Sequence, residues 1–266
     1  MQTVSICKSQ TDLKTKISAA IITFNEERNI QRCLESLQGV ADEIVVVDSF
    51  SKDRTEEICK SFGVRFIQNP FGGHIQQKNF AIDQTSHDWV LSLDADEALD
   101  ETLKQSILTV KDNPTQLGYS FNRLTNYCGH WVRYSGWYPD TKVRLVHKAH
   151  ARWAGINPHD RLDMLNNETV GHLNGDLLHY SYYTREDHLK QIEFFSNIAS
   201  KELFERNKTT NWLMIGLKMV AQFLKNILFK KGFLDGATGW TIARLSAYAT
   251  YKKYSKLMQL HRDSKA

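Results

Sequence analysis

The most constraining feature of this 266-residue chain is the alternation of apolar segments and helical patterns within its first 95 residues or so. Residues 17–23, 43–47, 64–67 and 89–93 have the apolar character of buried strands. Helical patterns follow the first three segments; Gly39 and Gly63 end two of them, and the third covers residues 74–84. Such alternation gives a mainly parallel sheet with right-handed crossovers and flanking helices. The predicted fold class is therefore α/β.

The pattern changes after residue 112. Short strands are predicted at residues 117–124, 130–134, 142–147 and 168–173, with many aromatic and polar residues between them. From residue 184 onward the pattern is helical, over 184–206, 211–229 and 237–258. We therefore expect two domains: a sheet domain over residues 1–183 and a C-terminal helical extension over residues 184–266.

Composition places the chain among globular proteins, with 41% hydrophobic and 24% charged residues. No run approaches 18 consecutive apolar residues, so no membrane-spanning helix is predicted. The N-terminus lacks the apolar segment of a secretion signal, which favours a cytoplasmic, reducing compartment. The four cysteines form no C-x-x-C pair, which argues against a disulfide framework or a zinc site. Cys33 and Cys59 are expected to be small buried residues.

Charge is distributed unevenly along the chain. Residues 201–266 contain 13 Lys and Arg against 4 Asp and Glu, whereas residues 1–200 contain 21 against 26. A basic C-terminal segment suggests contact with an anionic membrane surface, since no nucleic-acid-binding module accompanies it. Residues 211–229 have polar positions spaced for one helical face, so this helix either lies in a membrane interface or packs on the sheet domain. Those positions are Asn211, Lys218, Gln222, Lys225 and Asn226.

Polar residues follow each of the four predicted strands. In open parallel sheets, ligands bind beyond the carboxyl ends of the strands, so these residues are candidates for one binding site. They are Thr23, Asn25 and Glu26 after the first strand, Asp48 after the second, Lys78 on the helix after the third, and Asp94 and Asp96 after the fourth.

The carboxylates at this edge need a compensating cation. Helix capping explains isolated acids in such loops, but Asp48, Asp94 and Asp96 would meet at one place. A divalent metal, Mn²⁺ or Mg²⁺, binds carboxylate oxygens and shares them with substrate phosphates. Asp-x-Asp after a buried strand therefore predicts a metal that holds a diphosphate. Lys78 is either a solvated helix residue or a contact to a base or phosphate.

The strings SAAIITFNEERNIQRCLESL, ADEIVVVDSFSKDRTEEI, QKNFAI and DWVLSLDADE closely resemble the family 2 glycosyltransferases. These are inverting enzymes with the GT-A fold, a Rossmann-like sheet, and the chain is most similar to bacterial lipopolysaccharide-core β-glucosyltransferases. The resemblance covers residues 17–105 and continues in patches, including residues 232–240. It implies that Glu26 and the Thr23 backbone line the nucleoside pocket and that Asp48 contacts uracil or ribose.

The same resemblance implies further roles. Lys78 would lie against the base, Asp94 would bind ribose or metal-bound water, and Asp96 would ligate the metal. Members of this type tend to have His-Glu where this chain has His159-Asp160, and the shorter Asp160 follows a presumed loop over residues 155–158. Asp160 is nonetheless the expected general base, which would take a proton from the acceptor hydroxyl.

Aromatic and basic residues between positions 126 and 179 are candidates for the acceptor site. Aromatic faces stack on sugar rings and Arg binds phosphate or carboxylate, although core packing accounts equally well for many of these residues. His159 and His179 could serve as a metal ligand and an acceptor contact, or as structural histidines. The acceptor candidates are Trp137, Tyr138, Arg144, His159 and His179.

The sequence thus predicts a metal-dependent hexosyltransferase that moves a sugar from a nucleotide-sugar donor, a UDP-sugar, to a glycolipid or oligosaccharide acceptor such as lipopolysaccharide core. We expect it to work at the inner face of the cytoplasmic membrane as a peripheral protein. Two alternatives remain: a catalytically inactive scaffold in a glycan-assembly complex, and a sugar-nucleotide pyrophosphorylase. The latter would normally have a glycine-rich loop after the first strand, where this chain has Thr23-Phe24-Asn25-Glu26-Glu27.

Overall fold

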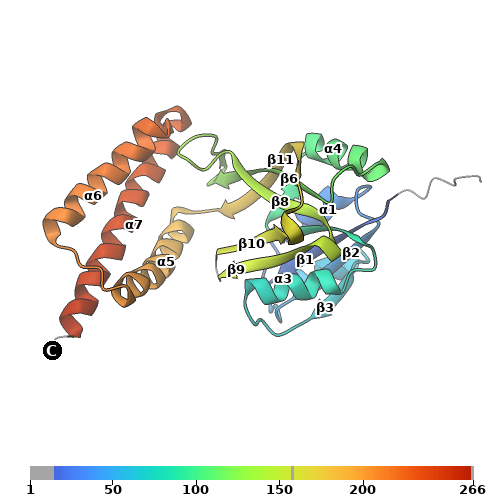
Figure 1. Cartoon of the computed structure of the whole chain (residues 1–266), viewed down its shortest axis with the longest axis horizontal. Coiled ribbons are helices and arrows are strands. Elements are labelled where there is room, and N and C mark those ends of the chain that lie inside the picture. Colours follow the sequence, from blue (N-terminus) through green and yellow to red (C-terminus); the bar gives the residue numbers. More distant parts are fainter. Residues whose placement is uncertain (1–14, 157–158, 265–266) are drawn as a thin grey trace, which may run out of the picture. The chain divides into compact units, whose positions relative to one another are not determined.

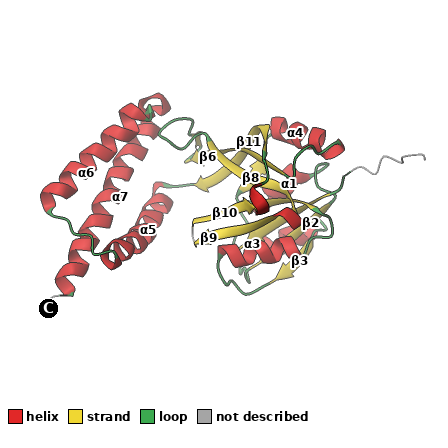
Figure 2. Cartoon of the chain, in the orientation of Figure 1, coloured by secondary structure: helices red, strands yellow, loops and turns green. Residues whose placement is uncertain are grey.

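The computed structural model describes residues 15–156 and 159–264, except the side chains of His159 and Asn167. Within these residues, nine strands form one mixed sheet and two more form a separate hairpin (Figures 1 and 2). The order in the large sheet is β3-β2-β1-β4-β8-β6-β11-β5, with β7 paired to β6. The chain divides into two compact units. The first contains residues 15–95, 99–121 and 143–175, and the second contains residues 96–98, 122–142 and 176–264.

The parallel strands of the first unit are β1 (Ile17–Thr23), β2 (Glu43–Asp48), β3 (Arg65–Gln68) and β4 (Trp89–Asp94). β1 lies between β2 and β4, and β2 also pairs with β3, in each case in parallel register. β1, β2 and β4 are almost continuously apolar because the sheet buries both of their faces. All four strands agree with the sequence prediction. β8 (Asp140–His147) then pairs with β4 in the antiparallel direction.

Three helices connect these strands: α1 (Ile30–Leu37), α2 (Thr55–Ser61) and α3 (His74–Asp83). α3 packs against β1, β2 and β4, and also against β9 (Ala151–Ile156). β9 forms an antiparallel hairpin with β10 (His159–Met164). A core cluster joins these elements through Ala20, Val45, Ile82, Val146, Trp153 and Leu162. Cys33 and Cys59 are fully buried, as predicted.

Several elements were not evident in the sequence pattern. β5 (Glu97–Leu99) and α4 (Glu101–Asp112) directly follow the acidic segment, and the Asp100 carboxylate caps α4 by accepting a hydrogen bond from Leu103 N. The expected loop at 155–158 is wrong for Gly155 and Ile156, which end β9; residues 157 and 158 lie outside the described part of the chain. β6 (Gly118–Tyr127) and β11 (Gly171–Tyr182) are longer than predicted, whereas β7 contains only His130–Trp131.

The second unit contains three long helices: α5 (Arg185–Glu205), α6 (Trp212–Leu224) and α7 (Gly236–Asp263). Thr184 and Asp187 form a capping box at the start of α5, and Asn211 caps α6. A π-helical turn, Lys225–Phe229, continues α6, and a short 3-10 helix, Gly232–Asp235, precedes α7. α7 contacts both α5 and α6 (Figure 1). A core cluster of Tyr127, Val132 and Ile242 supports the strands and helices of this unit.

Two sequence predictions bear on this helical part. The helical pattern from residue 184 is confirmed, and all of it falls in the second unit. The domain boundary at residues 183 and 184 stays a prediction, since the second unit also includes strand segments. The absence of a spanning helix stays a prediction: within the part of the chain that the structure describes, Trp212–Phe229 is, by length and composition alone, long and apolar enough to cross a membrane. Its mean hydropathy is 1.3, and 17% of it is buried.

Candidate active site

The carboxyl ends of β1, β2 and β4 bring the predicted donor residues together in the first unit. In the parallel register, Thr23 lies opposite Asp48, and Ile22 lies opposite Asp94. Asp48 and Asp94 therefore flank the end of β1 on its two sides. This edge is where ligands bind in open parallel sheets.

Asp48 is fully buried and fixed by the turn that follows β2. It accepts hydrogen bonds from the Ser51 hydroxyl and from Ser51 N, the latter at 2.8 Å. Burial raises the pKa of the nearby Cys59 thiol to about 12, with a further contribution from the negative charge of Asp48. The neighbouring Thr23 hydroxyl is buried without a hydrogen-bond partner among the described residues. A buried hydroxyl of this kind is available to a ligand.

The turn after β1 is held by the loop that precedes α2. Asn25 has a positive φ of 55°, a conformation that Asn tolerates, and its side chain accepts a hydrogen bond from Lys52 N at 2.8 Å. The backbone N–H of Glu26 donates to the Thr55 hydroxyl, and a Glu26 carboxylate oxygen accepts from the Asn29 side chain at 2.7 Å. The turn is therefore preorganised at the sheet edge.

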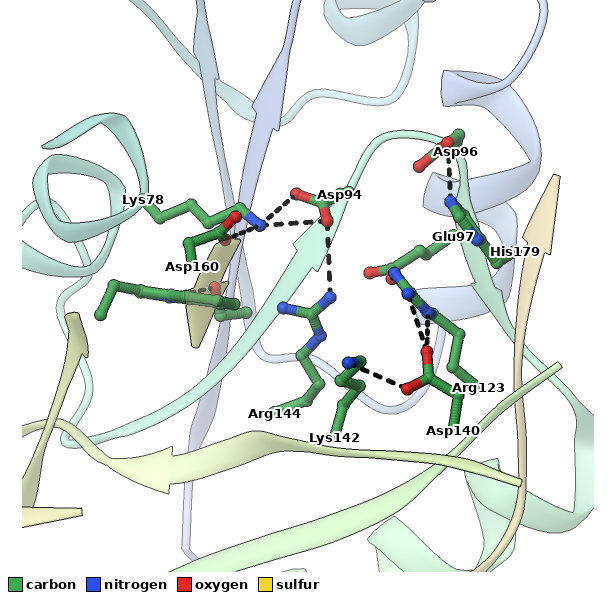
Figure 3. A network of polar contacts seen from close by, with 12 residues as sticks. Lys78, Asp94, Asp96, Glu97, Arg123, Asp140, Lys142, Arg144, Asp160 and His179 are labelled. Carbon is green, nitrogen blue, oxygen red and sulfur yellow. Dashed lines mark hydrogen bonds and ion pairs between the residues drawn. The ribbon is translucent and has the colours of Figure 1, made fainter. Parts of the chain in front are cut away.

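Lys78 links two of the predicted acids. Its side chain is buried, and its ammonium group lies 2.9 Å from Asp94 Oδ1 and 2.8 Å from Asp160 Oδ2 (Figure 3). Arg144 Nη2 lies 3.4 Å from Asp94 Oδ2, so Asp94 contacts two cations. Lys78 is therefore not a solvated helix residue, and its contact with a base or phosphate stays a prediction. Asp160, on β10, is brought to the sheet edge although it is 82 residues distant from Lys78.

Trp153 provides the surface on which both cations lie. The Lys78 ammonium is 4.2 Å from the ring centroid of Trp153, and the Arg144 guanidinium is 4.9 Å from it. Two hydrogen bonds between the Asn79 side chain and the Trp153 backbone, at 2.9 and 3.0 Å, attach β9 to α3. The indole N–H donates to the Ser92 hydroxyl at 3.2 Å. Cation–π contacts of this kind favour desolvated ammonium and guanidinium groups.

Asp96 lies in the second unit, where its partner is a histidine. Asp96 Oδ2 and His179 Nε2 are 3.1 Å apart (Figure 3). The backbone N–H of Tyr180 donates to the Asp96 carbonyl at 2.9 Å. Both side chains are half-buried. Across residues 15–156 and 159–264, no group of three or more His, Cys, Asp or Glu side chains has the arrangement of a metal site. Asp96 and His179 thus form a pair of candidate ligands rather than a complete cage.

A further polar network surrounds Arg123 in the second unit. Its guanidinium group lies 2.8 Å from Asp140 and 3.5 Å from the buried Glu97, and Lys142 lies 2.9 Å from Asp140. Burial alone would raise the pKa of Asp140, but the charges of Arg123 and Lys142 outweigh it and lower that pKa. Sequence analysis did not identify this network, because its members are far apart in the chain.

The predicted acceptor residues have different surroundings. Trp137 is half-buried and packs against Tyr127 and Tyr182, at centroid distances of 5.8 and 5.6 Å, which indicates a structural contribution. The Tyr138 hydroxyl donates to Asp176 at 3.0 Å; burial, with that hydrogen bond, raises the pKa of Tyr138. Arg144 is buried beside Asp94, whereas the side chain of His159 lies outside the described part of the structure.

Comparison with known proteins agrees with the geometry of the sheet edge. The family model described as glycosyl transferase family 2 matches residues 18–164, more than half of the chain. The chain belongs to this family. The match includes β1 to β4 and extends to the β9–β10 hairpin that carries Asp160. The α/β fold class and the GT-A fold predicted from the sequence are confirmed.

Curated relatives extend over nearly all of this glycosyltransferase. An uncharacterized glycosyltransferase of Rickettsia typhi is 32% identical over 261 residues, which cover 94% of this chain and 89% of the relative. The lipopolysaccharide core biosynthesis glycosyltransferase LpsC of Rhizobium meliloti is 27% identical over 258 residues, which cover 91% of this chain and 94% of LpsC.

Solved structures with similarity to the glycosyltransferase include S. aureus TarS in complex with UDP. It is 14% identical, with a TM-score of 0.45, over 94% of this chain and 92% of TarS. Glucosyl-3-phosphoglycerate synthase from Mycobacterium tuberculosis, in complex with Mn²⁺ and UDP-glucose, is 22% identical with a TM-score of 0.36. That match covers 42% of this chain and 44% of the synthase.

Proposed function

We propose that this glycosyltransferase moves a hexose from a UDP-sugar to a cell-envelope glycan or glycolipid acceptor, such as lipopolysaccharide core, with inversion at the anomeric carbon. The observation that carries the proposal is the contact of Lys78 with both Asp94 and Asp160 at the ligand-binding edge of the parallel sheet. The relation to LpsC supports the acceptor class. Family membership disfavours the pyrophosphorylase alternative.

In this proposal, residues at and after the carboxyl ends of β1, β2 and β4 bind the donor. Thr23, Asn25 and Glu26 line the nucleoside pocket, and Asp48 contacts the uracil or ribose. Lys78 contacts the base or a phosphate, and Asp94 binds the ribose or metal-bound water. The buried Thr23 hydroxyl and the preorganised turn at Asn25 support these roles. The positive charges of Lys78 and Arg144 at the same edge suit a diphosphate.

Asp160 is the proposed general base. Lys78 holds its Oδ2 atom, whereas Oδ1 has no partner within the described residues and can accept the proton of an acceptor hydroxyl. General-base assistance of this kind contributes about 10²–10⁴-fold in rate. Because the acceptor oxygen attacks from the face opposite the departing diphosphate, one displacement inverts the configuration, and no covalent nucleophile is needed.

Asp96 and His179 are the proposed protein ligands of Mn²⁺ or Mg²⁺. Asp96 Oδ2 and His179 Nε2 lie 3.1 Å apart, so both side chains would be able to hold the same ion. A carboxylate and an imidazole are both suitable for Mn²⁺. The metal, when bound, offsets the negative charge on the leaving diphosphate. His179 is then a metal ligand rather than an acceptor contact.

The remaining proposed roles concern the acceptor site. Tyr138 and His159 are the polar candidates for the incoming sugar, Trp137 supports them from the core cluster, and Arg144 acts through Asp94. We place the enzyme at the inner face of the cytoplasmic membrane, as a peripheral protein, because a glycolipid acceptor is itself held in a membrane.

Donor hydrolysis tests the proposal without knowledge of the acceptor. Purified protein is incubated with UDP-, GDP- and ADP-sugars, with and without Mn²⁺, and release of the nucleoside diphosphate is measured. We expect slow, Mn²⁺-dependent release of UDP from one UDP-hexose. The same sugar should raise the melting temperature in a parallel screen, because a ligand that binds only the native state stabilises it. Neither release nor stabilisation with any nucleotide sugar would favour the inactive scaffold.

A further inference from the structure

Two polar residues of helix α6, Lys218 and Gln222, lie on its protein-facing side, whereas large apolar residues on its opposite side face solvent. Ile215 and Asn226 are buried, the Gln222 side chain donates to Asn226 at 3.1 Å, and the Lys218 ammonium lies 3.9 Å from the ring centroid of Tyr254 on α7. The polar positions Lys218, Gln222 and Asn226 therefore lie toward α7, whereas Asn211 and Lys225 are exposed. A surface helix of a soluble protein has the opposite orientation.

The opposite side of α6 is a continuous apolar surface, which we call the outer face. Its residues recur at helical spacing, and Leu213 is 73% exposed, Leu217 58% and Val220 58%. A shallow groove runs along it, lined by Trp212, Leu213, Gly216, Leu217, Val220, Ala221 and Leu224. Leu228 and Phe229 extend the exposed apolar surface into the π-helical turn. An apolar patch of this continuity marks a site of interaction.

Basic residues accompany the outer face. Lys225, Lys230 and Lys231 are exposed at its C-terminal end. Residues 201–266 as a whole have 13 basic against 4 acidic side chains. The apolar helix face complements the acyl chains of a bilayer, and the exposed lysines complement its anionic headgroups.

We propose that the outer face of α6 inserts into the interface of an anionic membrane, with the helix axis parallel to the membrane plane. Leu213, Leu217 and Val220 enter the acyl region, and Lys225, Lys230 and Lys231 contact headgroup phosphates. The proposal is independent of the transfer reaction, because it rests only on residues of the second unit. It specifies the surface by which a peripheral enzyme would reach a membrane-held acceptor.

The packing of α6 distinguishes this mode from membrane spanning. A spanning helix would have to leave α7, which would place Lys218, Gln222 and Asn226 in hydrocarbon. In the structure all three are instead satisfied: Lys218 over Tyr254, and Gln222 and Asn226 by their mutual hydrogen bond. The helix also keeps aromatic contact with α7, since Phe223 and Trp240 have ring centroids 5.7 Å apart.

Vesicle binding by the full-length protein tests the apolar part of the proposal. Flotation compares vesicles of phosphatidylcholine alone with vesicles that also contain 30 mol% phosphatidylglycerol, a fraction chosen as roughly that of an anionic bacterial membrane. Wild type should bind the anionic vesicles preferentially, and less as salt is added. Leu217→Glu/Val220→Glu should lower the partition coefficient at least about tenfold. The matched control Leu165→Glu/Val170→Glu, at exposed positions of the first unit, should bind like wild type.

A second series tests the lysines. Replacing Lys225, Lys230 and Lys231 by Gln should weaken binding to anionic vesicles about fivefold for each lysine, while Lys60→Gln, on exposed α2, should have no effect. Near-ultraviolet circular dichroism verifies that each variant is folded. Equal binding by wild type and Leu217→Glu/Val220→Glu would overturn the proposal.

Two other outcomes would also overturn it. If bound protein resisted carbonate and high salt and required detergent for release, α6 would span the bilayer. If wild type failed to bind vesicles but sedimented as a dimer, and Leu217→Glu/Val220→Glu as a monomer, the outer face would bind a second copy of the chain. Analytical ultracentrifugation without vesicles measures whether the protein is a monomer or a dimer.

Discussion

The ammonium group of Lys78 lies 2.8 Å from the carboxylate of Asp160, across 82 residues of sequence. The contact joins α3, which follows the third parallel strand, to the β9–β10 hairpin. It therefore fixes the proposed base relative to the sheet edge that carries the proposed donor residues. Asp94 shares the same ammonium group, at 2.9 Å, so one buried cation orients two acids with different proposed roles.

Asp160→Asn should separate donor binding from transfer. The amide keeps the size of the carboxylate but cannot take a proton, so transfer should fall by about 10²-fold or more while binding of UDP stays within a few-fold of wild type. Transfer is measured with radiolabelled UDP-sugar and a lipopolysaccharide acceptor, and UDP binding by calorimetry. Asp163→Asn, on the same strand and paired with Arg161 at the surface, is the control. Near-normal transfer by Asp160→Asn would exclude Asp160 as the base.

Lys78→Met should destabilise the protein. The change removes the buried cation between Asp94 and Asp160, and breaking a buried ion pair on one side costs on the order of 3 kcal/mol of unfolding free energy. Urea denaturation at neutral pH measures the loss. Lys60→Met is the matched change at a mostly exposed position, and it should alter stability by less than about 0.5 kcal/mol. Equal effects of the two substitutions would show that the Lys78 contacts contribute little.

Asp96→Ala should abolish the stimulation of UDP binding by Mn²⁺. The binding that remains without metal should change little, because the proposed nucleoside contacts lie in the first unit. His179→Ala should raise the Mn²⁺ concentration needed for half-maximal stimulation, since it removes one of the two proposed protein ligands. Titration of Mn²⁺ against UDP affinity measures both, with Asp88→Ala as the control. Unchanged Mn²⁺ dependence in Asp96→Ala would contradict the metal assignment.

His188 should make the second unit sensitive to acid. Burial against Tyr127, Trp137 and Tyr182 lowers the pKa of this histidine to about 4. The unfolded chain, where the pKa is near 6.5, then binds more protons than the native chain between pH 6.5 and 4, so stability is lost as pH falls through that window. The loss attributable to this group is about 2 kcal/mol between pH 8 and pH 5.

Comparison with His188→Gln isolates that contribution. Other groups titrate in both proteins, so the quantity of interest is the difference in unfolding free energy between wild type and variant. This difference should shrink by about 2 kcal/mol from pH 8 to pH 5, as measured by urea denaturation at each pH. A difference that is independent of pH would show that His188 has the same pKa in the native and the unfolded protein.

The first four strands and three helices could be predicted because their signals are local. Continuous apolar runs, polar turns and the closing glycines at 39 and 63 specify each element, and parallel topology then brings Asp48, Asp94 and Lys78 to one edge. The contact of Lys78 with Asp94 follows from that topology. Family resemblance added Asp160, which no periodic pattern identified.

The rest of the fold and of the candidate site depends on contacts between residues far apart in the sequence, which no local pattern encodes. Trp153 lies beneath Lys78 and Arg144 because Asn79 attaches β9 to α3, a pairing over 74 residues. Asp96 meets His179 only after β11 returns to the sheet. The amphipathic character of α6 was evident, but its orientation was not, since spacing alone does not show which face meets α7.

The first unit is built from separate segments of the chain, which affects how it forms during synthesis. A chain that emerges from the ribosome completes β1 to β4 by residue 94, yet β4 pairs on its other side with residues 145–147 of β8. Until those residues emerge, the nascent sheet has an open edge at β4, and the Lys78 ammonium has neither Asp160 nor the Trp153 ring beside it. Open strand edges are where nascent chains misassemble. The edge of β4 therefore stays unpaired from the emergence of residue 94 until that of residue 147.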